Sequence, residues 1–428
     1  MKILYVGDGR SRENWGAKAT SAALLDLLSK NNSVPNTVKS ELKTRKFKLH
    51  TNIPFTGGLE KLVIDRNKKP IFKTLYSVLK RLGLKNDYIT EDVDLSLKNF
   101  LHIKDFYPEL KKTYVDLVAS DAVVLNGEGT FIFTTPPRRD AIFFLVILRL
   151  AQSLGKKTYC LNAMISDCPV NGRNQRTVDQ MVDIFKKCDG ITLRDPYSYQ
   201  FLKEIAPDLK TRFVPDALFT WISRIEEKNY LPTSQDKILQ IYYGKEIKLV
   251  SGDFSQPYIC ISGSSLAAWT KDKAISAYVD LVNKLKNTNI QLFIIPTASG
   301  DSFLSEVSRL TNVPLIPESI NIFAGAAILA NAEVFVSGRF HPSILASLGG
   351  TPCVFMGSNS HKTLTLQDML EYSDPIEYNA IPSATDIEEI FDQVVLILGN
   401  VKDRKVKIRN KVRTLAKAAE REISVLVK

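Results

Sequence analysis

Short apolar runs of strand length alternate with longer helical patterns through most of this 428-residue chain. The alternation begins at the N-terminus and begins again near Pro257, after a polar stretch without a clear period at 226–256. Strands that are separated by helices run parallel in their sheet, because each helix carries the chain back to the same edge. The sequence therefore predicts an α/β protein with two such domains, and the chain is long enough for two or three.

The expected elements follow from these patterns. In the first half we expect strands at 3–6, 122–125, 158–162, 190–193 and 212–214, and helices at 17–28, 140–154, 178–187 and 198–205. In the second half we expect strands at 258–262, 291–296, 333–337 and 353–356, and helices at 271–285, 301–310, 322–330 and 343–348. The expected boundaries are an N-terminal domain at 1–225, a linker at 226–256, a C-terminal domain at 257–400 and a closing helix at 401–428.

The net charge of +11 is concentrated in two segments. A basic insertion at about 37–110 interrupts the alternation, and its residues 38–86 contain 13 Lys or Arg and 3 Asp or Glu. Residues 402–428 contain 10 Lys or Arg and 3 Asp or Glu, and their apolar residues follow an amphipathic helix pattern. Such segments bind an anionic membrane, a lipid diphosphate or an acidic glycan, or they are solvated surfaces, and both interpretations stay open. No nucleic-acid-binding motif accompanies the charge, so nucleic acid is not an expected partner.

The cysteines and the N-terminus indicate a cellular compartment. Five cysteines without a CxxC pair are typical of reduced thiols in a reducing compartment. The apolar run at 3–6 is too short for a signal peptide, and the longest apolar stretch, 141–148, is too short to span a bilayer. We therefore expect a cytoplasmic protein. The four histidines lack ligand spacing, so no metal site is predicted.

The most informative loop contains Arg339 and His341, between a buried strand that ends at Ser337 and a helix expected to start near Pro342. Ligands of open parallel sheets bind beyond the carboxyl ends of the strands, and a helix N-terminus attracts anions. Arginine offers a planar fork for a carboxylate or phosphate, and histidine can donate a hydrogen bond or move a proton. The segment predicts an anion-binding centre. The alternative is an Arg that bridges to an acidic neighbour and a His that caps the helix.

Two other basic residues follow strands. Lys362, in the loop after the next strand, could contact a second anionic group, or it could be a surface lysine in a turn. Arg194 ends a strand of the first half and could pair with the same anion, or it could form a structural salt bridge. The next two residues, Asp195 and Pro196, suit the N-cap and first position of a helix.

Three residues are candidates for binding or activating a second substrate. Glu128 lies in a glycine-flanked segment that predicts a turn, where it could act as a general acid or base, or remain a solvated turn residue. The first loop, 7–16, lacks the GxGxxG fingerprint, so no dinucleotide cofactor is predicted. Its Asn14 and Trp15 would suit a sugar-binding wall. Asp216, just past a strand, is expected to stabilise its loop.

Together these motifs resemble the polysaccharide pyruvyl transferase family. The resemblance rests on the N-terminal strand with its Asn-Trp-Gly loop and helix, and on the segments 192–198, 214–216 and 337–341 in that order. The Lys362 loop also fits. The resemblance covers most of the chain apart from the basic insertion and the linker, and its most specific part is the Ser-x-Arg-x-His segment.

The resemblance implies a GT-B-like fold with two Rossmann-like domains facing a cleft, an N-terminal acceptor domain and a C-terminal donor domain. It implies phosphoenolpyruvate as donor, with no cofactor, and formation of a ketal on a sugar of an exopolysaccharide, a capsule or a lipid-linked precursor. The family's donor-binding Arg and His map onto Arg339 and His341, and its first-domain Arg maps onto Arg194. Where an acidic residue commonly follows the Asn-x-Gly loop, this chain has Ala17 and Lys18.

Two other functions keep the same residues. A GT-B glycosyltransferase with a nucleotide-sugar donor would also place a basic residue at a helix N-terminus of its second domain. A non-catalytic protein that binds anionic glycans or membranes would use the basic segments alone. The basic insertion also makes peripheral association with an anionic inner membrane an open hypothesis.

Overall fold

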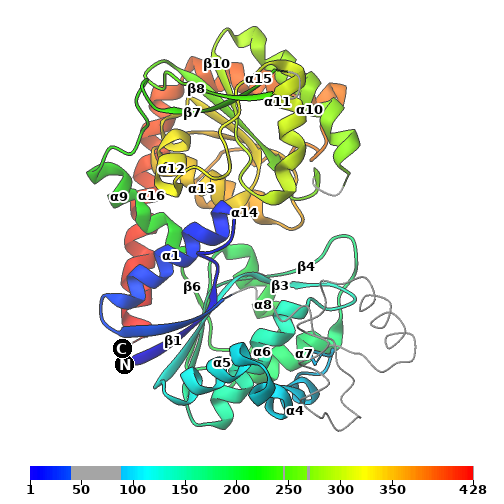
Figure 1. Cartoon of the computed structure of the whole chain (residues 1–428), viewed down its shortest axis with the longest axis vertical. Helices are drawn as coiled ribbons and strands as arrows, with labels where there is room; N and C mark the ends of the chain where they lie inside the picture. The colour runs from blue at the N-terminus through cyan, green and yellow to red at the C-terminus, as the bar shows by residue number, and fades with distance from the viewer. Residues whose placement is uncertain (40–87, 244–245, 268–269, 428) are drawn as a thin grey trace. The chain divides into compact units, whose positions relative to one another are not determined.

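The computed structural model describes residues 1–39, 88–243, 246–267 and 270–427 (Figure 1). The chain forms two compact units. The first unit consists of Met1–Asp8, Asn32–Thr192 and Leu202–Arg212, and the second consists of Gly9–Asn31, Leu193–Phe201 and Phe213–Lys428. Most of the basic insertion lies outside the described residues, so its ligands stay predictions.

The first unit is built on a sheet whose described strands follow the order β2-β1-β3-β4-β5-β6. The pairs among β1, β2, β3 and β4 are parallel. The strands are β1 (Lys2–Asp8), β2 (Ser33–Lys39), β3 (Ala122–Phe133), β4 (Lys157–Asp167), β5 (Gly190–Leu193) and β6 (Arg212–Phe213). The helices are α4 (Val93–Ile103), α5 (Pro108–Val118), α6 (Arg139–Ser153), α7 (Gln175–Phe185) and, continuing into the second unit, α8 (Pro196–Ile205). The apolar stretch 141–148 is buried along its whole length in α6, which explains why it is apolar on all sides.

The second unit contains a parallel sheet in the order β10-β9-β11-β12. Its strands are β9 (Tyr258–Ser264), β10 (Gln291–Ile294), β11 (Val334–Gly338) and β12 (Cys353–Phe355). The chain passes from β9 to β10 on one side and then returns to β11 on the other, which creates a topological switch point between β9 and β11. The helices are α1 (Trp15–Ser29), α9 (Ile222–Glu227), α10 (Lys271–Leu285), α11 (Leu304–Thr311), α12 (Ile322–Asn331), α13 (Phe340–Leu348), α14 (Lys362–Met369), α15 (Ala384–Gly399) and α16 (Val401–Leu426).

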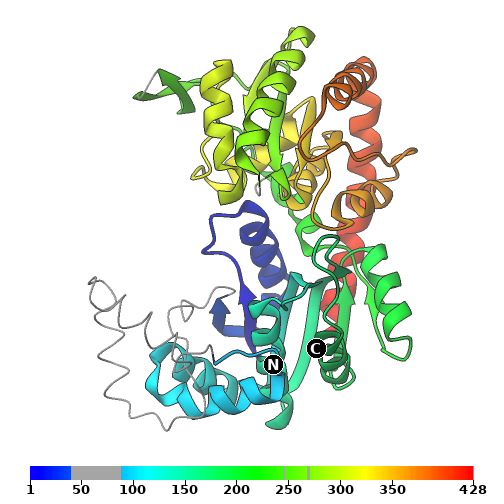
Figure 2. The same cartoon turned by 90° about the vertical axis from the view of Figure 1, so that its right-hand side faces the viewer.

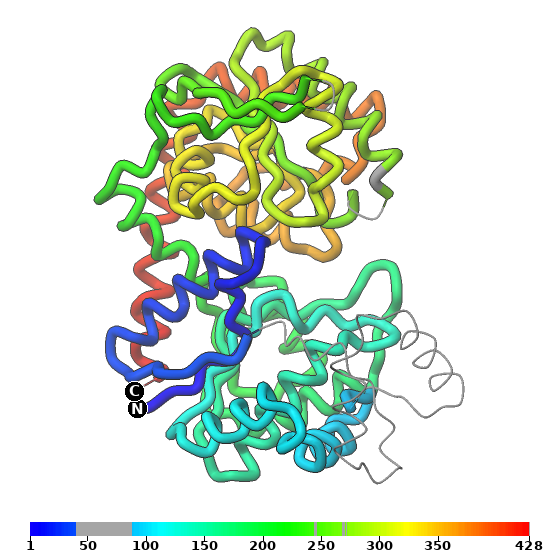
Figure 3. Tube along the Cα trace, in the orientation of Figure 1, coloured from blue at the N-terminus to red at the C-terminus, as the bar shows by residue number. Residues whose placement is uncertain are grey.

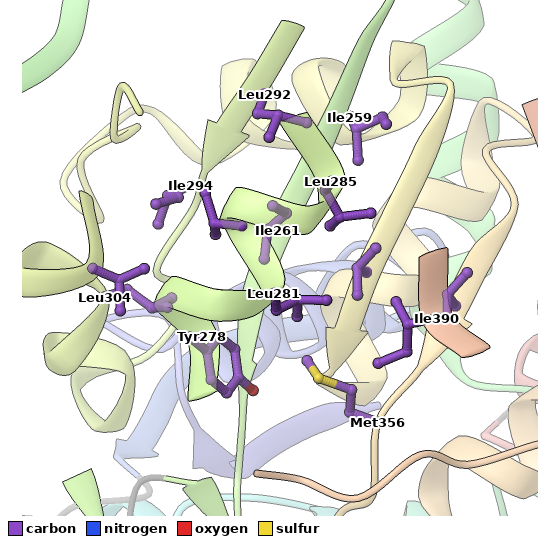
Figure 4. Packing of buried hydrophobic residues seen from close by; sticks show 14 of the residues in the cluster. Ile259, Ile261, Tyr278, Leu281, Leu285, Leu292, Ile294, Leu304, Met356 and Ile390 are labelled. Atoms are coloured by element: carbon purple, nitrogen blue, oxygen red, sulfur yellow. The ribbon is translucent and has the colours of Figure 1, made fainter. Parts of the chain in front are cut away.

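The core of the second unit forms between this sheet and α10 (Figure 4). Side chains from β9 and β10, including Ile261 and Ile294, meet the buried face of α10. That face has helical spacing, with Tyr278, Leu281 and Leu285 all completely buried. The apolar residues that follow a strand period in β9 and β10 thus pack against those that follow a helix period in α10.

The C-terminal helix α16 packs against segments from the other end of the chain. It contacts α1, α13 and the short 3₁₀ helix η3 (Ala217–Trp221). The trace in Figure 3 shows α1 in blue, the segment with η3 in green and α16 in red side by side. The apolar stripe of α16 is buried along these contacts, at Ile408, Val412, Leu415, Ala419 and Ile423. No described helix combines the length and apolar character needed to cross a membrane.

The expected strands and helices are confirmed, most with ends that differ by a few residues, whereas β3 and β4 continue eight and five residues beyond their expected ends. The unit boundaries differ from the continuous ranges that we expected, because α1 and the segments 193–201 and 213–225 group with the C-terminal half. These segments have apolar faces that could pack against either sheet, and the sequence pattern does not distinguish between the two.

Several elements were not expected. Strand β2 precedes the insertion, α4 and α5 lie at its end, and the linker contains the antiparallel pair β7 (Lys237–Tyr243) and β8 (Glu246–Ser251). Figure 2 shows this hairpin beside α11, at one edge of the second unit. Its strands were missed because β8 is exposed along most of its length, so polar and charged residues mask the period. Helices α9, α14 and α15 were not expected either.

Replacing Leu281 by Ala should lower the free energy of unfolding by about 2–5 kcal/mol, because the lost methyl groups leave a cavity under the sheet. Leu396→Ala, at a leucine of α15 that is 55% exposed, is the control and should change it by less than about 0.5 kcal/mol. Urea denaturation of both variants measures the difference. Equal effects of the two substitutions would contradict the core described above.

Candidate functional site

Arg339 lies at the junction between β11 and α13, beyond the carboxyl end of a central strand. The helix begins at Phe340, earlier than expected, so His341 belongs to its first turn. The junction is tightly bonded, since the Arg339 amide donates to Ser337 Oγ at 3.0 Å and the Arg339 carbonyl accepts from Ser343 Oγ at 2.8 Å. The backbone thus holds both predicted residues at the switch point of the sheet.

The guanidinium of Arg339 is held by a buried carboxylate. Its Nη2 and Nε donate to Asp301 Oδ1 at 2.5 and 3.2 Å, and the Asp301 side chain is fully buried. Asp301 follows β10, and its other oxygen accepts from the amide and hydroxyl of Thr297. The pair therefore spans the carboxyl ends of two strands. Because Nη1 of Arg339 makes no hydrogen bond within the described part of the chain, an anion can still bind this edge.

A second cluster joins Arg194, Asp216 and His341. Arg194 Nη1 lies 3.2 Å from Asp216 Oδ2 and 2.9 Å from His341 Nε2, and His341 Nε2 lies 3.2 Å from the same Asp216 oxygen. Arg194 is 1% exposed and Asp216 is fully buried. Arg194 also packs over the Phe340 ring, with its guanidinium carbon 4.6 Å from the centroid. Arg194 is thus an internal partner of His341, and it forms the structural salt bridge that the sequence left open as its alternative role.

The charge of Asp216 depends on these partners. Burial alone would raise its pKa, but the charge and hydrogen bond of His341 and the charge of Arg194 outweigh burial and hold the pKa well below its usual range. Thr20 Oγ1 and the Leu218 amide also donate to Asp216, at 2.8 and 2.9 Å. Asp216 therefore stays ionised at neutral pH and connects residues from four chain segments.

The two contacts of His341 Nε2 demand different protonation states. Arg194 is a permanent donor, so the 2.9 Å contact requires Nε2 to accept. Asp216 is an acceptor, so the 3.2 Å contact requires Nε2 to carry a proton. A proton that arrives at Nε2 would shift the hydrogen bond from Arg194 to Asp216. Because a neutral imidazole carries its proton on either nitrogen, each of the two contacts is open to one tautomer of His341.

The first turn of α1 covers the other edge of His341. A Cβ atom placed on Gly16 would lie 2.5 Å from His341 Nδ1, so the contact requires glycine. Trp15 anchors this turn, since its amide donates to the Thr297 carbonyl at 3.0 Å and its indole donates to the Glu318 carbonyl at 2.9 Å. Trp15 is completely buried and Asn14 caps α1 by accepting from the Ala17 amide. In this structure Trp15 therefore packs and Asn14 caps α1, and the sugar-binding wall expected from these two residues stays a prediction.

Glu318 is a titratable group that the sequence did not indicate. Burial and the charges of Glu13 and Asp301 raise its pKa to about 7, against the opposing charges of Arg339 and Lys18. Its Oε1 is buried and lacks a hydrogen-bond partner among the described residues. A carboxyl group that is partly protonated at neutral pH, beside a cationic site, suits general acid catalysis.

The structure brings Arg339, His341, Arg194 and Lys362 into one unit. Lys362 is the first residue of α14, and its Nζ donates to Asn359 Oδ1 at 3.0 Å. Glu128 belongs to the first unit. It lies inside β3 at φ 40°, partly buried, where a register shift against β4 replaces the expected turn. Its neighbour Gly127 is required by packing, because a Cβ there would lie 2.5 Å from Ala163 Cβ.

The acidic residues Asp301 and Glu318 were missed in the sequence, and Asp216 was assigned only to the stability of its loop, although its position after a strand was visible. Asp301 lies several residues beyond β10, and a search for loops that follow strands could have found it. No sequence signal marks Glu318, because its environment is made by segments that are distant in the chain. No three His, Cys, Asp or Glu side chains of the described ranges are grouped so as to hold a metal ion.

Replacing Gly16 by Ala should lower the melting temperature. An alanine usually stabilises a helix relative to glycine by about 0.5–1 kcal/mol, but here its methyl group would collide with His341. Gly399→Ala, at the end of α15, is the matched control, since a Cβ there meets no atom within 4 Å. Thermal unfolding compares the two. A Gly16→Ala variant as stable as the control would disprove the close packing of α1 on His341.

Replacing Glu318 by Gln should stabilise the protein increasingly as pH rises. The folded protein binds the Glu318 proton more tightly than the unfolded chain, whose ordinary pKa is 4.5. The stability from this proton is present below about pH 4.5 and is lost as pH rises through about 7, whereas Gln has no charge to bury. The difference in melting temperature should grow between pH 5 and pH 8. The exposed Glu246→Gln serves as control, and a constant difference for Glu318→Gln would contradict the explanation.

Comparisons with solved structures place the fold. The UDP-GlcNAc 2-epimerase of Methanocaldococcus jannaschii has a TM-score of 0.55 at 14% identity and covers 100% of this chain and 99% of its own. The UDP-GlcNAc 2-epimerase of Neisseria meningitidis bound to UDP-GlcNAc has a TM-score of 0.54 at 11% identity, with 100% of both chains covered. The MnaA–UDP structure of S. aureus has a TM-score of 0.55 at 11% identity, and the match covers 99% of this chain and 95% of that chain. The fold is therefore α/β and GT-B-like.

The sequence identifies the family more closely than these distant folds do. No curated protein matches the chain. The family model described as polysaccharide pyruvyl transferase matches residues 17–360. This range is most of the chain and includes Arg194, Arg339 and His341. The chain belongs to the polysaccharide pyruvyl transferase family.

Proposed function

We propose that this protein transfers the pyruvyl group of phosphoenolpyruvate to a sugar residue of a surface polysaccharide, or of its lipid-linked precursor, and forms a ketal. The family supports the reaction type. The observation that carries the proposal is the placement of Arg339 and His341 at the switch point of a parallel sheet, each beside a buried aspartate. The aspartates orient these basic groups, and the free edge of Arg339 suits an anionic donor.

The proposed reaction makes two bonds and breaks two at a single carbon, since two sugar oxygens replace the π bond of the enol ether and the bond to phosphate. A proton adds to the methylene carbon of phosphoenolpyruvate, and a sugar hydroxyl bonds to the neighbouring carbon. A second hydroxyl of the sugar then forms its bond as the bond to phosphate breaks. The sugar loses two hydroxyl protons. One balances the proton that was added to the methylene carbon, and the other leaves on the phosphate. Positive charge develops on the carbon and negative charge on the phosphate, so fixed cationic groups lower the barrier.

The residues divide this work by their geometry. Arg339 binds a carboxylate or phosphate oxygen through its free edge, and Lys362 contacts a second anionic group. His341 is assigned to phosphate contact and proton transfer, since its Nε2 lies within hydrogen-bond distance of both a donor and an acceptor. Arg194 adds positive charge and orients His341 from inside the protein.

Two carboxyl groups are assigned to the remaining proton transfers. Glu318 protonates the methylene carbon, since a carboxyl group with a pKa of about 7 keeps a proton at neutral pH. Glu128 remains our sequence-based prediction for activation of the acceptor hydroxyl. The two assignments are separable because the residues belong to different units. Glu318→Gln would remove the acid while preserving the shape of the side chain.

Arg339→Ala and His341→Ala should each reduce turnover about 10²–10³-fold, the effect of removing one group that stabilises developing charge. Release of inorganic phosphate from phosphoenolpyruvate, with candidate glycan acceptors, measures turnover. The matched controls are Arg309→Ala on the surface of α11 and His102→Ala on α4, which should leave it unchanged. Wild-type turnover in Arg339→Ala and His341→Ala would refute the assignment.

A nucleotide-sugar glycosyltransferase is the second candidate, because solved structures of this fold contain UDP-GlcNAc and UDP. Product mass distinguishes the two functions, since a pyruvyl ketal and a hexose add different masses to the acceptor. A non-catalytic protein that binds anionic glycans would show no thermal shift with phosphoenolpyruvate. Peripheral membrane association remains a separate proposal from the basic insertion, and failure to sediment with anionic vesicles at low salt would exclude it.

A further inference from the structure

A second histidine–aspartate pair, His361 with Asp195, is connected to the first through two adjacent residues of the chain. His361 Nε2 lies 3.1 Å from Asp195 Oδ1 and 3.2 Å from Ser198 Oγ. Asp195 immediately follows Arg194, which contacts His341. The dipeptide Arg194-Asp195 therefore contributes one side chain to each pair. Neither His361 nor this pairing was indicated by the sequence.

Asp195 is a buried carboxylate whose position is fixed by several hydrogen bonds. It is 1% exposed, and its Oδ1 accepts from the Ser198 amide at 2.8 Å and from Thr365 Oγ1 at 3.3 Å. Its Oδ2 accepts from Ser198 Oγ at 2.6 Å. Burial alone would raise the pKa of Asp195, but the hydrogen bond and charge of His361 and the bonds from Ser198 lower it. An ionised Asp195 fixes the direction of the imidazole and balances a positive charge on it.

The position of His361 favours an anionic ligand on its outer side. His361 is the N-cap residue of α14 and Lys362 is its first residue, so two basic side chains stand at the positive end of a helix dipole. Asp195 lies on the buried side of this helix end, through its contact with Thr365. The His361 side chain keeps 18% of its surface exposed, whereas Asp195 is enclosed. Asp195 and the Glu377 carboxyl, which accepts from the Leu364 amide, already lie at this helix end, so a further anion would bind the exposed side of His361 and Lys362.

We propose that His361, held by Asp195, binds the phosphate group of the anionic donor together with Lys362. This inference rests on the proposed function and extends it, since it assigns the phosphate end of the donor to a second imidazole. A phosphate is favoured over a carboxylate because its greater charge and its three oxygens suit two separate basic groups. The role of His361 is binding, and Asp195 and Ser198 are positioning residues.

His361→Gln should weaken the binding of inorganic phosphate about tenfold or more, since it removes a charge-assisted hydrogen bond. The binding of oxalate, which has carboxylates but no phosphate, should weaken less than about twofold in the same variant. Calorimetric titration of the full chain with each probe measures both. His102→Gln on α4 is the matched control and should bind both probes as the wild type does. Ser198→Ala, which keeps the imidazole but removes one of its contacts, should give a smaller loss for phosphate.

The results separate this inference from the proposed function. Phosphate binding by His361→Gln at wild-type strength, with an unchanged melting temperature, overturns the inference. Equal losses for phosphate and oxalate also overturn it, because the residue would then not select phosphate. If phosphate binding depends on His361 but the wild type does not bind phosphoenolpyruvate, the phosphate site stands and the proposed donor is wrong.

Discussion

The buried carboxylate of Asp216 is the interaction on which the candidate site depends. It accepts from Thr20 on α1, from the Leu218 amide in η3 and from Arg194 after β5, and it lies beside His341 on α13. An ionised group with no exposure is tolerated only when its oxygens are fully bonded. Each of the four segments is therefore constrained to present its donor at one point. Removing Arg194, its permanently charged partner, would leave the buried charge of Asp216 poorly compensated, which typically costs about 3–5 kcal/mol.

A similar arrangement occurs at three basic side chains of the site. Arg339 is paired with Asp301, His341 with Asp216 and His361 with Asp195, and every aspartate is buried more deeply than its partner. A buried carboxylate behind a basic side chain orients that side chain. Cationic groups held in this way need little reorganisation when a ligand acquires negative charge, which is the basis of electrostatic preorganisation.

Glycine and aromatic residues in α1 allow this helix to approach closely. Gly16 leaves room for His341, and the indole of Trp15 fills the space above Gly325 on α12. The Asn-Trp-Gly loop thus has a structural explanation that differs from sugar binding. It joins α1 to the unit that contains the basic residues, and it places Thr20 at Asp216. A motif that belongs to the family resemblance can therefore support the site through packing alone.

The sequence by itself determined the α/β class, most strands and helices of the two alternating halves, and the junction with Arg339 and His341. These features depend on local periods of hydrophobicity and on short-range capping preferences, which a single segment expresses. It could not determine that Arg194 is buried, that β3 continues through Asn126–Gly129, or that α1 joins the C-terminal half. Only the tertiary structure decided which aspartate pairs with each basic group and why Glu318 has a raised pKa. The physical reason is that burial and charge pairing arise between segments up to some three hundred residues apart, such as Trp15 and Glu318, and no local pattern encodes those contacts.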